Sequence, residues 1–213
     1  VSDFVGANWP VLLVAAALAG LIAFTTTPAV RVLAYRIGAI DVPKDNRRMH
    51  KKPIPRIGGL AIFTGFAIST LVFCRMSPEL IAIYVGGLIL VVVGIIDDIF
   101  RINAWIKLIA QIGVAFIAVS QGVVVEYINF FGKYIHFGIF SIPITVLWIV
   151  GLTNAINLID GLDGLACGVS AICSLSLLLV MILKGEYVVA LMTAPIVGAC
   201  LGFLPFNSNP AII

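Results

Sequence analysis

The sequence predicts an all-α, polytopic integral membrane protein with about seven transmembrane helices. Two properties of the composition support this prediction. Hydrophobic residues make up 62% of the 213 positions and charged residues only 11%, and the mean hydropathy of +1.17 lies far outside the range of soluble domains. The charged residues are also clustered rather than spread, as expected when apolar helices cross a bilayer.

Uncharged runs give the expected spans. Each run has 17 residues or more, and about 20 residues at a rise of 1.5 Å cross a hydrocarbon core of about 30 Å. No internal repeat or low-complexity linker is visible, so we expect residues 1–213 to form a single transmembrane domain. The runs are 4–30, 57–74, 80–96, 108–125, 134–159, 164–183 and 187–213.

The positions of lysine and arginine predict the orientation. Ten of the 13 basic residues lie beside the ends of the first and third runs, and loops rich in these residues stay in the cytoplasm. The N-terminus is therefore expected outside and the C-terminus in the cytoplasm. Residues 126–138, which are rich in aromatic side chains, are expected to form a short extracytoplasmic segment, either an interfacial belt or a small hairpin.

Residues 36–56 form a basic cytoplasmic loop that leads into Gly58 and Gly59. Pro53 and Pro55 favour an extended backbone there. Glycines at a helix N-terminus let backbone N–H groups approach an anion closely, which favours a phosphate-binding loop. The alternative is a purely electrostatic clamp that holds anionic lipid headgroups.

Asp97 and Asp98 end the third run. The C-terminal end of a helix carries partial negative charge, so carboxylates there are unfavourable unless a cation compensates. Arg101 could form a local ion pair with either one, which would make the pair structural. Because neighbouring helical residues point about 100° apart, we otherwise expect one carboxylate to face a ligand and the other to support it.

Polar residues recur at the end of the fifth run. Asn154, Asn157 and Asp160 are spaced by three residues, which predicts one stripe on a helix, and Asp163 stands between Gly161 and Gly164. Oxygen ligands of this kind suit Mg²⁺ that is shared with substrate phosphates. A polar seam for helix packing is the alternative, but two carboxylates and two asparagines exceed what packing requires.

Three motifs together resemble the polyprenyl-phosphate N-acetylhexosamine-1-phosphate transferases, glycosyltransferase family 4. Their order and spacing agree over about 170 residues. The motifs are Arg56 with Gly58-Gly59 after Pro-x-Pro, Asp97-Asp98 followed by Lys107 and Gln111, and Asn154-Ala-x-Asn-x-x-Asp160-Gly-x-Asp163-Gly-Leu.

The resemblance implies a Mg²⁺-dependent phosphoglycosyltransferase, with Mn²⁺ as an alternative metal, on the cytoplasmic face of a bacterial plasma (inner) membrane. The segment Pro-Ile-Pro-Arg-Ile-Gly-Gly is similar to the branch that transfers N-acetylglucosamine 1-phosphate from UDP-GlcNAc to undecaprenyl phosphate with release of UMP. That reaction starts polymers such as teichoic acid or the lipopolysaccharide O-antigen. The peptidoglycan branch, which uses UDP-N-acetylmuramoyl-pentapeptide and usually reads Thr-Pro-Thr-Met-Gly-Gly there, is the alternative.

The same resemblance implies partners and roles. The expected partners are a UDP-N-acetylhexosamine, undecaprenyl phosphate and the bilayer, without nucleic acid; a homodimer is left open. The expected roles are catalytic for Asp97 and Asp98, metal-binding for Asn157 and Asp160, and substrate-binding for Asp163, Asn154, Lys107, Arg56 and His50.

Family members continue beyond the segment that ends here with a Gly-Asp motif, whose aspartate helps to bind the metal, and a His-rich loop. The chain is therefore expected to be the N-terminal part of a longer transferase and inactive alone. A secondary transporter with intramembrane carboxylates is the main alternative class, and a non-catalytic scaffold is another. Transporter sites usually lie near the bilayer midplane in repeated halves, whereas these aspartates flank runs on one side without repetition.

Overall fold

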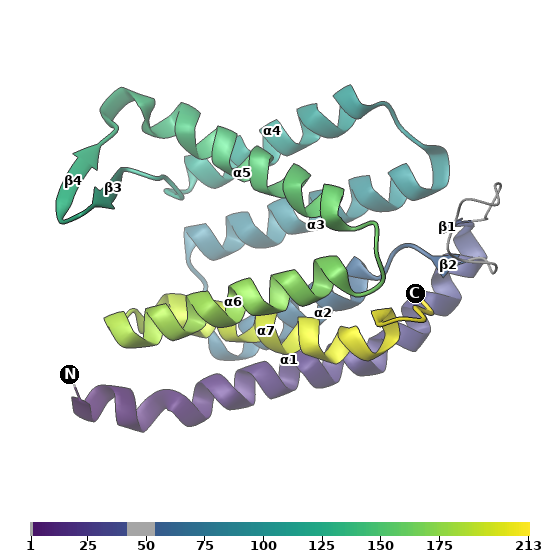
Figure 1. Cartoon of the computed structure of the whole chain (residues 1–213), viewed down its shortest axis with the longest axis horizontal. Helices are drawn as coiled ribbons and strands as arrows, with labels where there is room; N and C mark the ends of the chain where they lie inside the picture. Colours follow the sequence, from purple (N-terminus) through teal and green to yellow (C-terminus); the bar gives the residue numbers. More distant parts are fainter. Residues whose placement is uncertain (1, 42–53) are drawn as a thin grey trace. The chain divides into compact units, whose positions relative to one another are not determined.

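The computed structural model describes residues 2–41 and 54–213, and these form an all-α fold as predicted. In lipid, a long apolar stretch that does not pair with a neighbouring strand must make its backbone hydrogen bonds within itself, and a helix does this. Two short antiparallel ladders accompany them (Figure 1). The helices of the described residues are α1 (Ser2–Ile37), α2 (Gly59–Phe73), α3 (Pro78–Phe100), α4 (Ala104–Ser120), α5 (Ser141–Ile159), α6 (Leu165–Lys184) and α7 (Tyr187–Asn207).

Five of these helices are long and apolar enough to cross a membrane: α1 from Trp9 onward, α3, α5 with the preceding 3-10 turn, α6 and α7. The helices α2 and α4 have 15 and 17 residues, which at 1.5 Å per residue fall short of a core of about 30 Å. Side chains such as Leu147, Ile172 and Leu183 are 67–86% exposed, a degree of apolar exposure that a bilayer accommodates and water does not. The orientation stays a prediction.

The chain divides into two compact units. Unit 1 comprises Val1–Arg75, Asp98–Phe100 and Ile159–Ile213, and therefore holds α1, α2, α6 and α7 with the ladder of β1 (Ile40–Asp41) and β2 (Ile54–Pro55). Unit 2 comprises Met76–Asp97 and Arg101–Leu158, with α4, α5 and nearly all of α3.

Small residues bring α1 and α7 of unit 1 into backbone contact. A side-chain carbon at Gly198 would overlap the carbonyl of Ala16, and one at Gly202 would overlap that of Gly20. Close approach of this kind is how helices associate in lipid, where apolar side chains gain little by leaving the solvent. The two glycines therefore determine how closely α7 packs against α1.

Replacing Gly198 by alanine is expected to destabilise unit 1, because the backbone of α1 must move to admit the methyl group. Overpacking of this kind costs on the order of 1–3 kcal/mol, which should lower the melting temperature in detergent by several degrees. Gly168→Ala in α6 is the matched control, since its added carbon meets nothing within 4 Å. Equal melting curves for the two variants would contradict this packing.

The helix α2 packs against α1 and α7 through its own small residues. The Ser69 hydroxyl donates a hydrogen bond of 2.7 Å to the carbonyl of Ala15, and Gly65 faces the backbone of Ala19. At its N-terminus, Gly58 leaves room for the buried ring of Phe203. Gly58 and Gly59, at the start of α2, were expected to let a phosphate approach, and this stays a prediction. What the structure shows for Gly58 is the packing against Phe203.

Unit 2 contains the small hairpin that was one of the two expectations for residues 126–138. Strands β3 (Tyr127–Phe130) and β4 (Lys133–His136) pair in register, and the turn between them places Phe131 and Gly132 at positive φ. The side chain of Asn129 accepts a hydrogen bond of 2.9 Å from the Gly132 N–H. Turns with both central residues at positive φ match the twist of paired strands.

Two expected runs in unit 2 have different boundaries in the structure. The run 134–159 begins as strand β4, and its helix α5 begins at Ser141. The run 108–125 leaves the helix after Ser120, where Gly122 adopts a φ of 91°. In both cases turn geometry overrides a continuous apolar sequence, because hydropathy alone does not distinguish a short strand from a helix.

Candidate active site

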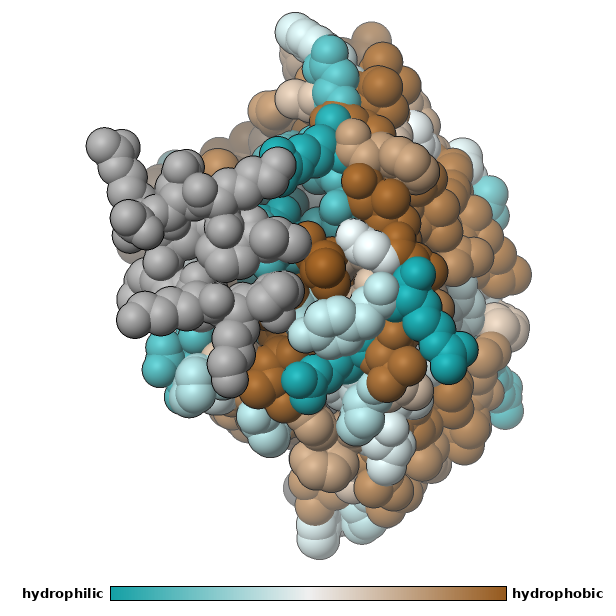
Figure 2. All heavy atoms as spheres, turned by 90° about the vertical axis from the view of Figure 1, so that its right-hand side faces the viewer, coloured by the Kyte–Doolittle hydropathy of each residue, from teal (hydrophilic) through white to brown (hydrophobic). Residues whose placement is uncertain are grey.

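The ladder of β1 and β2 positions Arg56 at the base of the basic loop. Ile40 pairs with Pro55 and Asp41 with Ile54, which confirms the extended course expected at Pro55. The N–H of Arg56 donates a hydrogen bond of 3.1 Å to the carbonyl of Ala39. Figure 2 looks onto the end of unit 1 where these strands lie, and hydrophilic residues are exposed there.

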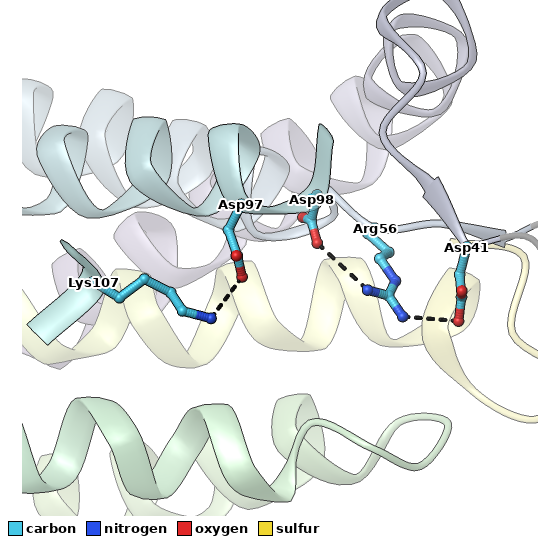
Figure 3. A network of polar contacts seen from close by, with 5 residues as sticks. All are labelled: Asp41, Arg56, Asp97, Asp98 and Lys107. Atoms are coloured by element: carbon cyan, nitrogen blue, oxygen red, sulfur yellow. Dashed lines mark hydrogen bonds and ion pairs between the residues drawn. The ribbon is translucent and has the colours of Figure 1, made fainter. Parts of the chain in front are cut away.

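The guanidinium of Arg56 lies between two carboxylates in unit 1 (Figure 3). One terminal nitrogen is 2.8 Å from an oxygen of Asp41, and the other is 3.9 Å from an oxygen of Asp98, in the last turn of α3. The side chain of Arg56 is 45% exposed. This arrangement supplies the cation that a carboxylate at a helix C-terminus requires.

Asp97, the preceding residue of α3, has a different partner within unit 2. An oxygen of its carboxylate accepts a hydrogen bond of 2.9 Å from the Nζ of Lys107 (Figure 3). Lys107 reaches it because α3 ends at Phe100 and the next residue, Arg101, turns the chain with a φ of 50°. Asn103 then caps the start of α4, where its side chain accepts a hydrogen bond from the N–H of Trp105. The local pair with Arg101 is not formed among the described residues.

The helix α5 presents the two asparagines of the predicted stripe in unit 2. The amide nitrogen of Asn154 donates a hydrogen bond of 2.6 Å to the side-chain oxygen of Gln111 and another of 2.9 Å to the carbonyl of Val150. Asn157, one turn further, is exposed. Gln111 therefore holds the Asn154 carboxamide in a defined orientation, while the Asn157 side chain is open to a ligand.

Asp160 and Asp163 lie beyond the end of α5, in unit 1. The helix ends at Ile159, so Asp160 is not the next member of a helical stripe but the first residue of the turn that leads to α6. One oxygen of Asp163 accepts two hydrogen bonds of 3.1 Å, from the side chain of Asn209 and from the N–H of Ala211. The segment after α7 therefore fixes Asp163.

Desolvation raises the pKa of Asp160 above the usual range of an aspartic acid, and the positive charge of Arg56 lowers it in part. The carboxyl group is partly screened by solvent, which limits the size of the effect. A raised pKa means that the folded chain favours the neutral form.

The stability of the chain should therefore depend on the charge of Asp160. Because the pKa of Asp160 is higher in the folded than in the unfolded chain, its contribution to stability is fully present below the unfolded pKa. This contribution is lost as the pH rises through the folded pKa. We expect Asp160→Asn to melt at a higher temperature than the parent at pH 7.5, and at the same temperature below about pH 3, where the acid is protonated in both states. A pH-independent difference between the two melting curves would contradict the shift.

The structure thus brings the predicted residues together in two sets. Unit 1 holds Arg56, Asp98, Asp160 and Asp163, and unit 2 holds Asp97, Lys107, Asn154 and Asn157. His50 lies outside the described residues. Among the described residues no three His, Cys, Asp or Glu side chains converge on a metal position.

Three residues of the site were not assigned a role from the sequence. Asp41 pairs with Arg56, Gln111 orients Asn154, and Asn209 holds Asp163. Gln111 had a signal, because it belongs to the second motif. Asp41 and Asn209 gave none, since the contacts that define them bridge 15 and 46 residues of sequence.

Comparison with known proteins identifies the family of this chain. The model of glycosyl transferase family 4 matches residues 80–213. A probable undecaprenyl-phosphate N-acetylglucosaminyl 1-phosphate transferase of Bacillus subtilis is 44% identical over 191 residues, which cover 88% of this chain and 53% of that protein. The decaprenyl-phosphate N-acetylglucosaminephosphotransferase of Mycolicibacterium smegmatis is 36% identical over 216 positions, covering 92% and 53%.

A phospho-N-acetylmuramoyl-pentapeptide-transferase of Caldicellulosiruptor bescii is 32% identical over 185 residues, 81% of this chain and 57% of that protein. The chain thus spans about half the length of the curated relatives it matches. The match covers α3 to α7, which carry the paired aspartates and the polar stripe. The chain belongs to glycosyl transferase family 4.

Proposed function

We propose that the full-length protein transfers N-acetylglucosamine 1-phosphate from UDP-GlcNAc to undecaprenyl phosphate, releases UMP, and so starts a cell-envelope polymer. The observation that carries this proposal is the pairing of carboxylates with cations near helix ends, Asp97 with Lys107 and Asp98 with Arg56, in a chain 44% identical to a relative whose name states this acceptor and this sugar. The reaction would take place on the cytoplasmic face of the plasma membrane.

The chemistry joins two anions. An oxygen of the lipid phosphate forms a bond to the phosphorus that carries the sugar, and the bond from that phosphorus to the bridging oxygen of the pyrophosphate breaks, so that the electron pair leaves with UMP. The acceptor monoester has a second pKa near 6 and is largely dianionic at pH 7. Repulsion between the reactants is therefore the main obstacle, and fixed cations reduce it most effectively where water is excluded.

Asp97 is the carboxylate that we assign to the acceptor phosphate or its residual proton. Its partner Lys107 has a compact charge with three rotatable donors, so its Nζ can hold Asp97 and contact a phosphate oxygen at the same time. The side chain of Asp97 is 27% exposed and that of Lys107 33%. Asp98 has the supporting role, because its partner Arg56 is itself tethered to Asp41.

Asn157 and Asp160 are the chain's own candidates for Mg²⁺. One carboxylate and one carboxamide are the kind and number of protein ligands that Mg²⁺ takes when it keeps waters and shares substrate phosphates. The bound ion would neutralise charge on the phosphates and on the leaving UMP. Asp163, held by Asn209 and the Ala211 N–H, and Asn154 would position the nucleotide side of the donor.

Arg56 and His50 complete the proposed anion site. The side chain of Arg56 lies at the C-terminal end of the basic loop and is about half exposed. Its positive charge acts on Asp160, whose pKa it lowers in part. His50 belongs to the same loop in sequence. We assign both to the phosphates of the donor or the acceptor, since arginine matches phosphate geometry well.

The test is UMP release by membranes that carry the full-length protein, supplied with Mg²⁺, undecaprenyl phosphate and one donor at a time. We expect release with UDP-GlcNAc that depends on the lipid. Release only with UDP-N-acetylmuramoyl-pentapeptide would instead select the activity named for the Caldicellulosiruptor bescii relative. No lipid-dependent release with either donor, from folded protein, would overturn the proposed function.

A further inference from the structure

Asp41 is the one carboxylate of the site in unit 1 that neither the sequence motifs nor the proposed roles use. Its oxygen lies 2.8 Å from a terminal nitrogen of Arg56, while the second terminal nitrogen lies 3.9 Å from Asp98 (Figure 3). One guanidinium fork thus spans two carboxylates that come from β1 and from the end of α3. Asp41 therefore limits where Arg56 can point.

The backbone already fixes the positions from which these side chains start. Gly38 ends α1 with a φ of 77°, and the N–H of Ala39 donates a hydrogen bond of 3.0 Å to the carbonyl of Ala34 in α1. The carbonyl of Ala39 in turn accepts from the N–H of Arg56. Only the long side chain of Arg56 is left to be oriented, and the contact with Asp41 does so.

Stability does not account for the pair of Asp41 and Arg56. Their side chains are 27% and 45% exposed, and ion pairs with this exposure contribute little to folding, since water and salt screen them. An arginine, however, loses many rotamers when it is held in place. A pair that adds little stability but restricts a flexible cation beside Asp98 is better explained by positioning.

We propose that Asp41 is a positioning residue that acts through Arg56: it holds the guanidinium so that one side of the fork faces Asp98 at the end of α3. This inference rests on the proposed transferase function, because its consequence is a rate. Arginine suits the task and lysine does not, since only the planar fork can engage two carboxylates in fixed directions.

The experiment uses the full-length protein in membranes and measures kcat and KM for UDP-GlcNAc. Asp41→Asn should lower kcat/KM by roughly 10- to 100-fold, the upper value corresponding to a displacement of about 1 Å near the reacting groups, while the melting temperature stays at the parent value. Asp41→Glu, which keeps the carboxylate, should recover most of the rate. Glu126→Gln, an exposed carboxylate outside the site, is the matched control for loss of charge and should behave as the parent.

A double-mutant cycle tests the route through Arg56. In an Arg56→Lys background, Asp41→Asn should cause little further loss, because the fork that it orients is gone; two residues that act through one another give non-additive effects. Full additivity, or an Asp41→Asn variant as active as the parent, would overturn the inference. The inference would also be overturned if Asp41→Asn and Asp41→Glu lost the same amount of activity and both had the same lowered melting temperature. An inactive parent would refute the proposed function instead.

Discussion

Replacing Asp97 by asparagine in the full-length protein is expected to lower the rate of UMP release by about 10²- to 10⁴-fold, the range typical of a group that handles a proton or developing charge in the transition state. Asparagine keeps the size of the side chain, and its amide oxygen can still accept the hydrogen bond from Lys107, whose Nζ lies 2.9 Å from the Asp97 carboxylate in the parent chain. The KM for UDP-GlcNAc should change much less, because Asp97 is assigned to the acceptor. The measurement is steady-state kinetics with both substrates varied.

The Asp98→Asn variant is the comparison for this prediction, because it removes the neighbouring carboxylate instead. Asp98 is adjacent in sequence but pairs with Arg56 at 3.9 Å, and we assign it a supporting role. Its loss should therefore be clearly smaller than that of Asp97→Asn. If Asp98→Asn were the more severe change, the roles of the two carboxylates would be reversed, and if neither changed the rate, the assignment of both would be wrong.

Removing divalent metal ions with EDTA is expected to abolish UMP release, and adding Mg²⁺ in excess should restore it. The reason is electrostatic: without the ion, the donor pyrophosphate and the acceptor phosphate meet with their full negative charge. Asp160→Asn should raise the Mg²⁺ concentration needed for half-maximal rate by roughly 10- to 100-fold, the range typical of weakened metal sites. The titration of the rate with Mg²⁺ measures this directly.

Two controls separate metal binding from general damage. Asp163→Asn should lower donor affinity and leave the Mg²⁺ requirement near the parent value, because Asp163 is already engaged by Asn209 and Ala211. Full activity in EDTA would contradict a metal-dependent reaction. An unchanged Mg²⁺ requirement in Asp160→Asn would remove Asp160 from the set of ligands.

Helix content could be predicted from hydropathy, but helix ends could not. The first apolar run stops at Val30, whereas α1 continues through Arg31 and Arg36 to Ile37. Charges mark where a chain leaves the hydrocarbon, not where its backbone stops being helical, since exposed arginine is a good helix former. Conversely, the run through Val125 loses its helix at Gly122, because a positive φ ends it irrespective of hydropathy.

The sequence predicted which residue types form the site, but it did not predict most of their ion-pair and hydrogen-bond partners. Asp97 and Asp98 stood out as carboxylates at a helix C-terminus, and a compensating cation was required there. Helix spacing suggested Arg101, whereas the structure supplies Lys107 by reversing the chain into α4 and Arg56 from the strand ladder. Contacts over 10 and 42 residues depend on tertiary folding, which no local period in the sequence encodes.

The most direct test of the account is the identity of the lipid product. Membranes with the full-length protein would be incubated with undecaprenyl phosphate, Mg²⁺ and UDP-GlcNAc, and the extracted lipids analysed by mass spectrometry beside Asp97→Asn membranes. We predict undecaprenyl pyrophosphate that carries one N-acetylglucosamine, formed in equal amount to UMP and nearly absent with Asp97→Asn. UDP-GlcNAc left unconsumed with no such lipid, from protein shown to be folded, would contradict the account.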